Sequence, residues 1–145
     1  MKLPLVSSRT ILAVVAVAMS ATISEAKDDS KAEQCPTREL DSIADLIHQA
    51  PSCRRALRLF EICAFGASGD VALGTAVTEK CEGDFLNKLT VSQKETYDRK
   101  QKRCAIKYQN KAGTMYRSFE AFCGAYVARN YSDRFLTPVH GRKSR

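Results

Sequence analysis

Six cysteines constrain this 145-residue chain more than any other feature, because the way they pair limits how its segments can pack. Even the closest two, Cys53 and Cys63, are separated by ten positions. Zinc sites commonly use cysteines about two to four residues apart, and the only histidines are His48 and His140. An even number of dispersed cysteines favours three disulfides over a metal site. The six are Cys35, Cys53, Cys63, Cys81, Cys104 and Cys123.

The N-terminus has the order of features found in secretory signal peptides. Lys2 and Arg9 supply positive charge, an apolar run covers residues 11–19, and small residues stand where a signal peptidase would cut. An uncleaved anchor is the alternative, but it needs ~20 mostly apolar residues, and polar residues interrupt this run too soon. We therefore expect residues 1–26 to be a cleaved signal peptide and residues 27–34 to be a flexible lead. Export to the periplasm or the exterior would place the cysteines in an oxidising space.

The hydrophobic pattern after the lead is helical. Leu40, Ile43 and Ile47 recur at the spacing that places them on one face of a helix, whereas alternating β-branched runs are few. We therefore expect an all-α, disulfide-stapled bundle of about four to five helices over residues 35–136, followed by a basic tail over residues 137–145. The expected helices cover residues 37–49, 51–65, 71–89, 92–111 and 114–135.

Polar and small residues next to these segments indicate how the helices begin and which faces they bury. Pro51 suits the first turn of the second helix, and Asp70 is expected to cap the third. Ser92 and Glu95 form a capping-box pattern before the fourth helix, with Thr90 as the other candidate cap. The expected inner face of the last helix consists of Met115, Phe119, Phe122 and Tyr126.

Gly113 is expected to end the fourth helix and to form the turn of a helical hairpin. Cys104 lies nine residues before this glycine and Cys123 lies ten after it, so the two would face each other across the hairpin. Six cysteines allow fifteen pairings, and this is the only pair with direct support. The same argument about a turn at Ala50 favours Cys35–Cys63, which leaves Cys53–Cys81.

Charge is distributed unevenly between the two halves of the mature chain. Residues 27–93 hold eight Lys and Arg against eleven Asp and Glu, which gives 8 − 11 = −3, whereas residues 94–145 hold thirteen against four, which gives 13 − 4 = +9. A basic stripe in the fourth helix would attract anionic polymers or a membrane surface. A solvated face without a specific partner is the equally weighted alternative, and export argues against nucleic acid. The stripe consists of Arg99, Lys100, Lys102, Arg103, Lys107 and Lys111.

No pattern in the chain points to catalysis. Nucleophile motifs, phosphate-binding loops and metal signatures are missing from the sequence, and paired cysteines leave no thiolate. The acidic residues Glu79, Glu82 and Asp84 surround Cys81, but neighbouring lysines favour a solvated helix face over an acid–base pair. We therefore expect a protein that is not an enzyme and that uses no cofactor.

A set of residues in the second half forms a recognisable pattern. It consists of Tyr97, Asp98 and Arg99 before Cys104, the segment CAIKYQNKAGTMYRSFEAFC with Gly113, Thr114 and Met115 in its turn, and then Arg129 and Leu136. With these residues, segment 93–136 resembles the LprI-type lysozyme-inhibitor family of bacterial envelope proteins. The resemblance implies a small, helical, disulfide-bonded exported module that binds lysozyme.

The chain also departs from this family. The first half lacks the family's usual Asp…Leu-Asn stretch, and Tyr97 stands where tryptophan is common. Animal lysozymes are basic, so the acidic N-terminal half would have to make the contact. The main hypothesis is therefore an exported, non-catalytic binding protein of the bacterial envelope with a lysozyme or another envelope macromolecule as partner. The alternative is a basic envelope protein that binds anionic lipid, lipopolysaccharide or cell-wall polymer.

Overall fold

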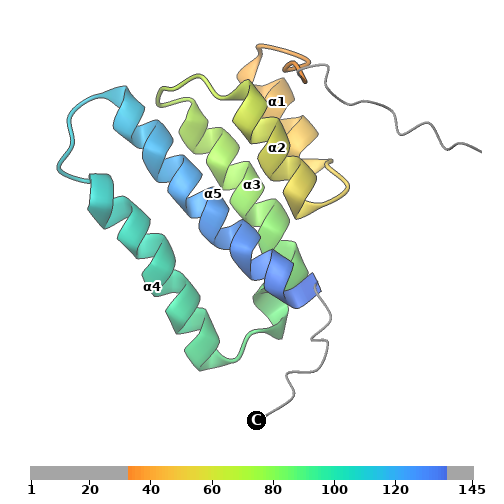
Figure 1. The fold of residues 1–145 in the computed structure, drawn as a ribbon, viewed down its shortest axis with the longest axis vertical. Helices are drawn as coiled ribbons and strands as arrows, with labels where there is room; N and C mark the ends of the chain where they lie inside the picture. Colours follow the sequence, from red (N-terminus) through yellow and green to blue (C-terminus); the bar gives the residue numbers. More distant parts are fainter. Residues whose placement is uncertain (1–32, 137–145) are drawn as a thin grey trace, which may run out of the picture. The chain divides into compact units, whose positions relative to one another are not determined.

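The computed structural model describes residues 33–136, and all of their regular secondary structure is helical (Figure 1). The expected signal peptide and basic tail lie outside the described residues. None of the described helices is both long and apolar enough to span a membrane. The all-α prediction is confirmed. The elements are α1 (Leu40–His48), α2 (Cys53–Cys63), α3 (Asp70–Phe85), the 3-10 turn η1 (Leu86–Lys88), α4 (Val91–Tyr108) and α5 (Thr114–Leu136).

Helices α3 and α5 run side by side in the same direction at the centre of the bundle (Figure 1). Two hydrogen bonds fix their register, because Ser118 Oγ donates to Asp70 at one end and Ser132 Oγ donates to Asp84 at the other, each at 2.5 Å. Helix α4 runs back along one side of α5, while α1 and α2 pack on the other side of the central pair. Each outer helix thus rests on the α3–α5 pair.

Small residues allow α3 and α5 to approach closely. A methyl group added at Gly74 would lie 2.8 Å from the Ala121 side chain, which is too short for real atoms, and 3.0 Å from the Ala121 carbonyl oxygen, which is unusually tight. The residues that α5 buries are accordingly mostly small, with one tyrosine among them. They are Ser118, Ala125, Ala128, Tyr131 and Ser132.

This close approach contradicts the inner face expected for the last helix. Met115 is 49% exposed, and Phe119 and Tyr126 are each 41% exposed, so these three side chains point away from α3. Phe122 is the exception, since it is half-buried and its ring stacks on Phe60 of α2 at 4.1 Å. Bulky rings would hold α3 and α5 apart, which is why the small residues occupy the inner face and the rings do not.

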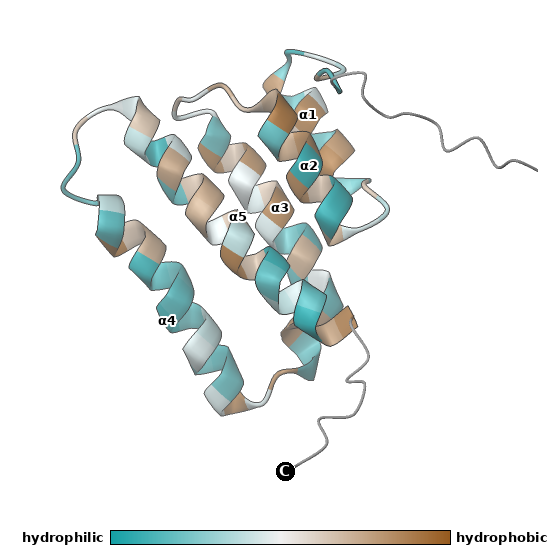
Figure 2. Ribbon diagram, in the orientation of Figure 1, coloured by the Kyte–Doolittle hydropathy of each residue, from teal (hydrophilic) through white to brown (hydrophobic). Residues whose placement is uncertain are grey.

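The hydrophobic core joins the central pair to α1 and α2. Figure 2 shows hydrophobic residues on these helices, whereas α4 is largely hydrophilic. The main link from α4 to the core is the buried ring of Tyr97, which lies 5.1 Å from Phe85 and 5.0 Å from Tyr131. A single buried ring makes α4 the least embedded of the long helices.

Three disulfides tie the elements together, and they are the same pairs that the spacing favoured. Cys104–Cys123 joins α4 to α5 across the turn at Gly113, whose φ is +105°. The other two, with Cα separations of 4.9 and 4.6 Å, attach the segment before α1 to α2 and α2 to α3. They are Cys35–Cys63 and Cys53–Cys81.

Several helix ends differ from the sequence-based expectation. Pro51 lies outside α2, because Ser52 is the N-cap and accepts a hydrogen bond from the Arg55 N–H. The third expected segment, 71–89, is α3 followed by the separate turn η1. Glu33, in the expected flexible lead, forms ion pairs with Arg55 and Arg58.

The expected capping interactions are confirmed in one part and wrong in two. Thr90, one of the two candidate caps of α4, is its N-cap, but the capping box pairs it with Gln93 and is not formed by Ser92 and Glu95, because glutamine supplies the same side-chain acceptor. Asp70 is the first residue of α3 and does not cap it. Its fully buried carboxylate instead accepts hydrogen bonds from the N–H groups of the preceding loop and from Ser118, so it holds that loop against α5.

Candidate functional site

The six predicted basic residues lie along one broad side of α4 and just beyond its end. Lys100, Arg103 and Lys107 follow one another at three- and four-residue spacing, which makes them neighbours on the helix surface. Arg99 lies beside Arg103, Lys102 lies further round the helix from Lys107, and Lys111 follows the end of the helix. We call Lys100, Arg103 and Lys107 the cationic flank.

The cationic flank lies next to aromatic rings. Lys107 Nζ is 5.0 Å from the centre of the Tyr108 ring, and Lys100 Nζ is 5.0 Å from that of Tyr131. Arg134, from the last turn of α5, lies 5.8 Å from the same Tyr131 ring. These distances suit cation–π attraction, which holds the side chains at the α4–α5 boundary.

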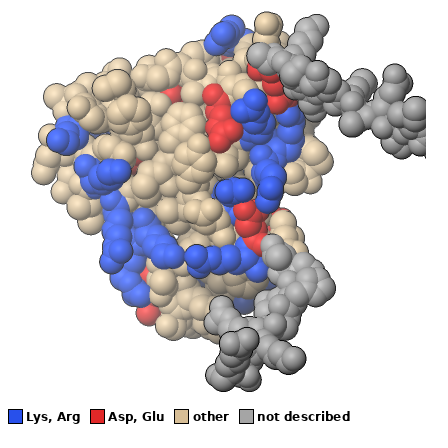
Figure 3. Space-filling model, in the orientation of Figure 1, with Lys and Arg blue, Asp and Glu red and all other residues tan. Residues whose placement is uncertain are grey.

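An open groove of about 610 Å³ lies at this boundary, and we call it the aromatic groove. Tyr108 from α4 and Phe119 from α5, with ring centres 6.0 Å apart, form one end, and Phe122 and Tyr126 lie 6.2 Å apart further along α5. Figure 3 shows Lys and Arg along α4 and across the lower part of the molecule, bordering an area over α5 that lacks charged side chains. The groove is lined by Lys107, Tyr108, Phe119, Phe122, Cys123, Tyr126, Val127 and Asn130.

Tyr126 marks the far edge of the aromatic groove. Its hydroxyl donates a hydrogen bond of 2.9 Å to Glu61 of α2. Partial burial of the ring and this bond to a carboxylate raise the pKa of Tyr126 above its ordinary value. The side chain is therefore a neutral, amphipathic ring with its apolar face toward the groove at neutral pH.

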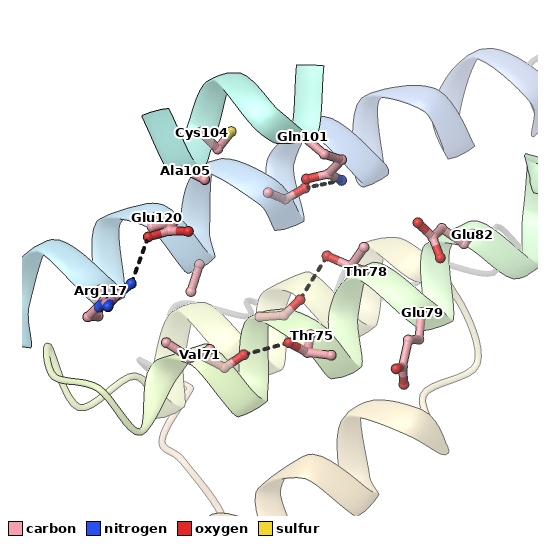
Figure 4. A pocket seen from close by; sticks show the side chains of 13 residues that line it. Val71, Thr75, Thr78, Glu79, Glu82, Gln101, Cys104, Ala105, Arg117 and Glu120 are labelled. Atoms are coloured by element: carbon pink, nitrogen blue, oxygen red, sulfur yellow. Dashed lines mark hydrogen bonds and ion pairs between the residues drawn. The ribbon is translucent and has the colours of Figure 1, made fainter. Parts of the chain in front are cut away.

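A second groove, of about 400 Å³, lies between α3, α4 and α5 (Figure 4). Glu82 borders it from α3 and Glu120 from α5, while Glu79 lies at its edge with its side chain directed away from α4 and α5, toward α1. Arg117 Nη1 lies 3.5 Å from the Glu120 carboxylate, so one cation partly offsets three carboxylates. We call this the acidic groove, and its lining residues are distinct from those of the aromatic groove.

The carboxylates expected on one solvated helix face have three different surroundings, so that interpretation is wrong for two of them. Glu82 and Asp84 are half-buried and accept hydrogen bonds from Tyr97 and Ser132. Only Glu79 fits the expectation, since it is exposed and its carboxylate lies 3.8 Å from the Nε2 atom of His48. The cause is the position of α3 among its neighbours, since Glu82 faces α4, Asp84 faces α5 and Glu79 faces the end of α1.

Tyr97 connects the acidic groove to the core. Its hydroxyl donates to Glu82 at 2.7 Å and accepts from the Gln101 side-chain amide at 2.8 Å, and that amide also donates to the Gly124 carbonyl. Burial, followed by the hydrogen bond to Glu82, raises the pKa of Tyr97 far above its ordinary value. This network positions Glu82 and holds α4 at a fixed distance from α5.

All six cysteines are in disulfides, and residues 33–136 contain no group of three His, Cys, Asp or Glu side chains placed to hold a metal ion. The disulfides indicate folding in an oxidising compartment.

Sequence reasoning missed both grooves as sites. Gly74, Ala121 and Gly124 line the acidic groove, and their small size lets α3 and α5 meet while leaving room beside α4. The aromatic groove depends on rings of the last helix that face outward, whereas the sequence pattern predicts them on its inner face. The available signal was the row of small residues 118, 121, 125 and 128 in the last helix, which competes with the aromatic row for the buried face.

Comparison with known proteins found no match: no family model, no curated protein and no solved structure is significantly similar to this chain. The resemblance to the LprI-type family therefore stays a prediction.

Proposed function

We propose that the chain is an exported, non-catalytic binding protein of the bacterial envelope that docks on an anionic surface through α4. The observation that carries this proposal is the cationic flank. In the described part of the chain, no carboxylate lies within ion-pair distance of Lys100, Arg103 or Lys107, so their charge is available to a partner. The signal-like residues 1–26 and the disulfides support an envelope location.

Binding assays over a range of salt concentration test this function. Mature, oxidised protein is expected to bind anionic phospholipid vesicles, lipopolysaccharide or an anionic cell-wall polymer, and to lose that binding steeply as salt screens the charges. A protein that binds none of these at low salt, or whose binding is insensitive to salt, contradicts the proposal.

A matched pair of variants locates the contact. Arg103→Gln with Lys107→Gln removes one arginine and one lysine from the cationic flank, while Arg99→Gln with Lys102→Gln removes the same two types from positions further round α4 from Lys107. The first pair is expected to weaken binding by tenfold or more, since each cation near an anionic surface contributes ~1 kcal/mol, and the control pair by much less. Equal losses would mean that only net charge matters and that α4 has no binding flank.

The acidic groove favours a second candidate function, lysozyme inhibition. A basic enzyme would be repelled by the cationic flank but attracted by Glu79, Glu82 and Glu120. The test is lysozyme activity with excess oxidised protein, alongside a variant with Glu79→Gln and Glu120→Gln, which spares the Tyr97–Glu82 bond. Inhibition that this variant loses supports the candidate, whereas several lysozymes at full activity would rule it out.

A further inference from the structure

We infer that the anionic surface is a phospholipid bilayer. The exposed rings that line the aromatic groove insert into the membrane interface, while the cationic flank binds the lipid headgroups. This inference rests on the proposed docking through α4 and names the partner more narrowly. It assigns a separate role to Phe119 and Tyr126, which the proposed function leaves unused.

The first argument is the exposure of large apolar side chains on one face of α5. Met115, Phe119 and Tyr126 are each at least 41% exposed, and their spacing of four and seven residues places them on the same side of the helix. Single exposed apolar residues are common, but a contiguous patch marks an interaction site. Tyr126 and Tyr108 also have the apolar body and polar tip that suit a membrane–water boundary.

The second argument is that charged and apolar side chains meet at one boundary. Lys107 both belongs to the cationic flank and lines the aromatic groove, and Lys100 and Arg134 lie over Tyr131 at the same boundary. A hydrophilic anionic polymer would satisfy these cations but would offer no partner to the rings. A bilayer with anionic lipid offers phosphate groups and acyl chains within a few ångströms of each other, so it matches both.

The same charges argue against a second copy of the chain as the occupant. Two copies that faced each other across this groove would bring Lys107 and its neighbours on the flank close to the same cations of the other copy, since a two-fold contact pairs like surfaces. Like charges opposed across an interface are unfavourable. An anionic bilayer removes that repulsion.

A single tryptophan can report insertion, because the chain has none. Phe119→Trp places the probe in the aromatic groove, and Val71→Trp places it at an exposed position that lines the acidic groove. With vesicles of phosphatidylglycerol and phosphatidylethanolamine, the emission of the first variant is expected to shift to shorter wavelength and to be quenched by brominated acyl chains. The emission of the Val71→Trp variant is expected to stay unchanged, and polyphosphate is expected to shift neither.

An affinity comparison completes the test without relying on the probe. Phe119→Ser is expected to reduce vesicle binding about tenfold and to leave polyphosphate binding unchanged, whereas Ile106→Ser, an exposed change on α4 of comparable size, is expected to do neither. Circular dichroism and the melting temperature of both variants verify that each is folded.

Each outcome separates the inference from the function on which it rests. Vesicle binding without a spectral shift, and with an unaffected Phe119→Ser variant, overturns insertion while docking through α4 stands. Failure of wild-type protein to bind vesicles, lipopolysaccharide and polymer refutes both. Self-association that Phe119→Ser abolishes would show that a second copy occupies the groove, and it would overturn the bilayer assignment.

Discussion

The contact between α3 and α5 can be tested with two glycines of the same helix. Gly74→Ala adds a methyl group where the nearest atoms are the side chain and the carbonyl oxygen of Ala121, at 2.8 and 3.0 Å. Gly83→Ala adds the same group where no atom beyond the adjacent residues and the backbone of its own helix lies within 4 Å. The two changes are chemically identical, so any difference between them reports the packing at Gly74.

The expected magnitudes follow from two opposing effects. Alanine is preferred over glycine inside a helix by about 0.5–1 kcal/mol, and Gly83→Ala should show this gain alone. At Gly74 the added methyl group overpacks the interface, which typically costs about 1–3 kcal/mol, and a backbone oxygen among the contacts favours the upper part of that range. The net loss for Gly74→Ala should therefore be about 1–2 kcal/mol.

Urea and thermal unfolding of the oxidised protein measure both values. At about 4 °C per kcal/mol for a domain of this size, Gly74→Ala should lower the melting temperature by about 4–8 °C, and Gly83→Ala should raise it by about 2–4 °C. If Gly74→Ala is as stabilising as Gly83→Ala, then α3 and α5 do not approach as closely as described, and the explanation for the outward-facing rings of α5 is wrong.

Three further changes test the other contacts that hold the helices. Asp70→Ala removes a fully buried carboxylate that accepts three hydrogen bonds and should lower the free energy of unfolding by about 3 kcal/mol; a loss below 1 kcal/mol in urea unfolding would refute its role. Tyr97→Phe should cost about 1.5–3 kcal/mol at neutral pH, because it removes the bond to the Glu82 carboxylate. The pKa of Tyr97 is raised in the folded state, so its contribution to the free energy of unfolding should be complete below the ordinary tyrosine pKa of ~10 and should be lost as pH rises above that value. The Tyr97→Phe variant should lose less stability over that range, and parallel pH profiles of the two proteins would contradict this. Replacing Cys104 and Cys123 by alanine opens a loop of sequence separation 19, which should cost about 3 kcal/mol and should increase hydrogen exchange selectively in α4; uniform exchange across all helices would contradict that local role.

The helices and the disulfide pairs could be predicted because they depend on local patterns. Leu40, Ile43 and Ile47 recur with the helical period, and glycine at position 113 supplies the positive φ that the hairpin turn uses. Equal spacing on either side of that turn then brings Cys104 to Cys123. Such features need only the rise and period of a helix.

The buried face of the last helix could not be predicted in this way. Its small residues and its aromatic residues recur at similar spacing on neighbouring faces, so periodicity alone supports either orientation. The decision comes from Gly74, which lies 47 positions before Ala121 and permits the close approach. Thr90 is one of the two caps that the sequence offers for α4, but the sequence does not decide which capping box forms, since Thr90 with Gln93 and Ser92 with Glu95 are equivalent patterns.

The same helix contact accounts for both grooves. Because small residues allow α5 to pack closely on α3, the rings of α5 lie on its other side, where Phe119 and Tyr126 line the aromatic groove. Helix α4 packs on α5 mainly through Tyr97 and one disulfide, so it lacks the bulk to cover either side of the central pair. Carboxylates from α3 then face one opening, and the cations of α4 border the other. Larger residues at positions 74 and 121 would push α3 and α5 apart and disturb the contact that leaves these rings exposed, so the apolar face of the bilayer proposal depends on the small residues of the core contact.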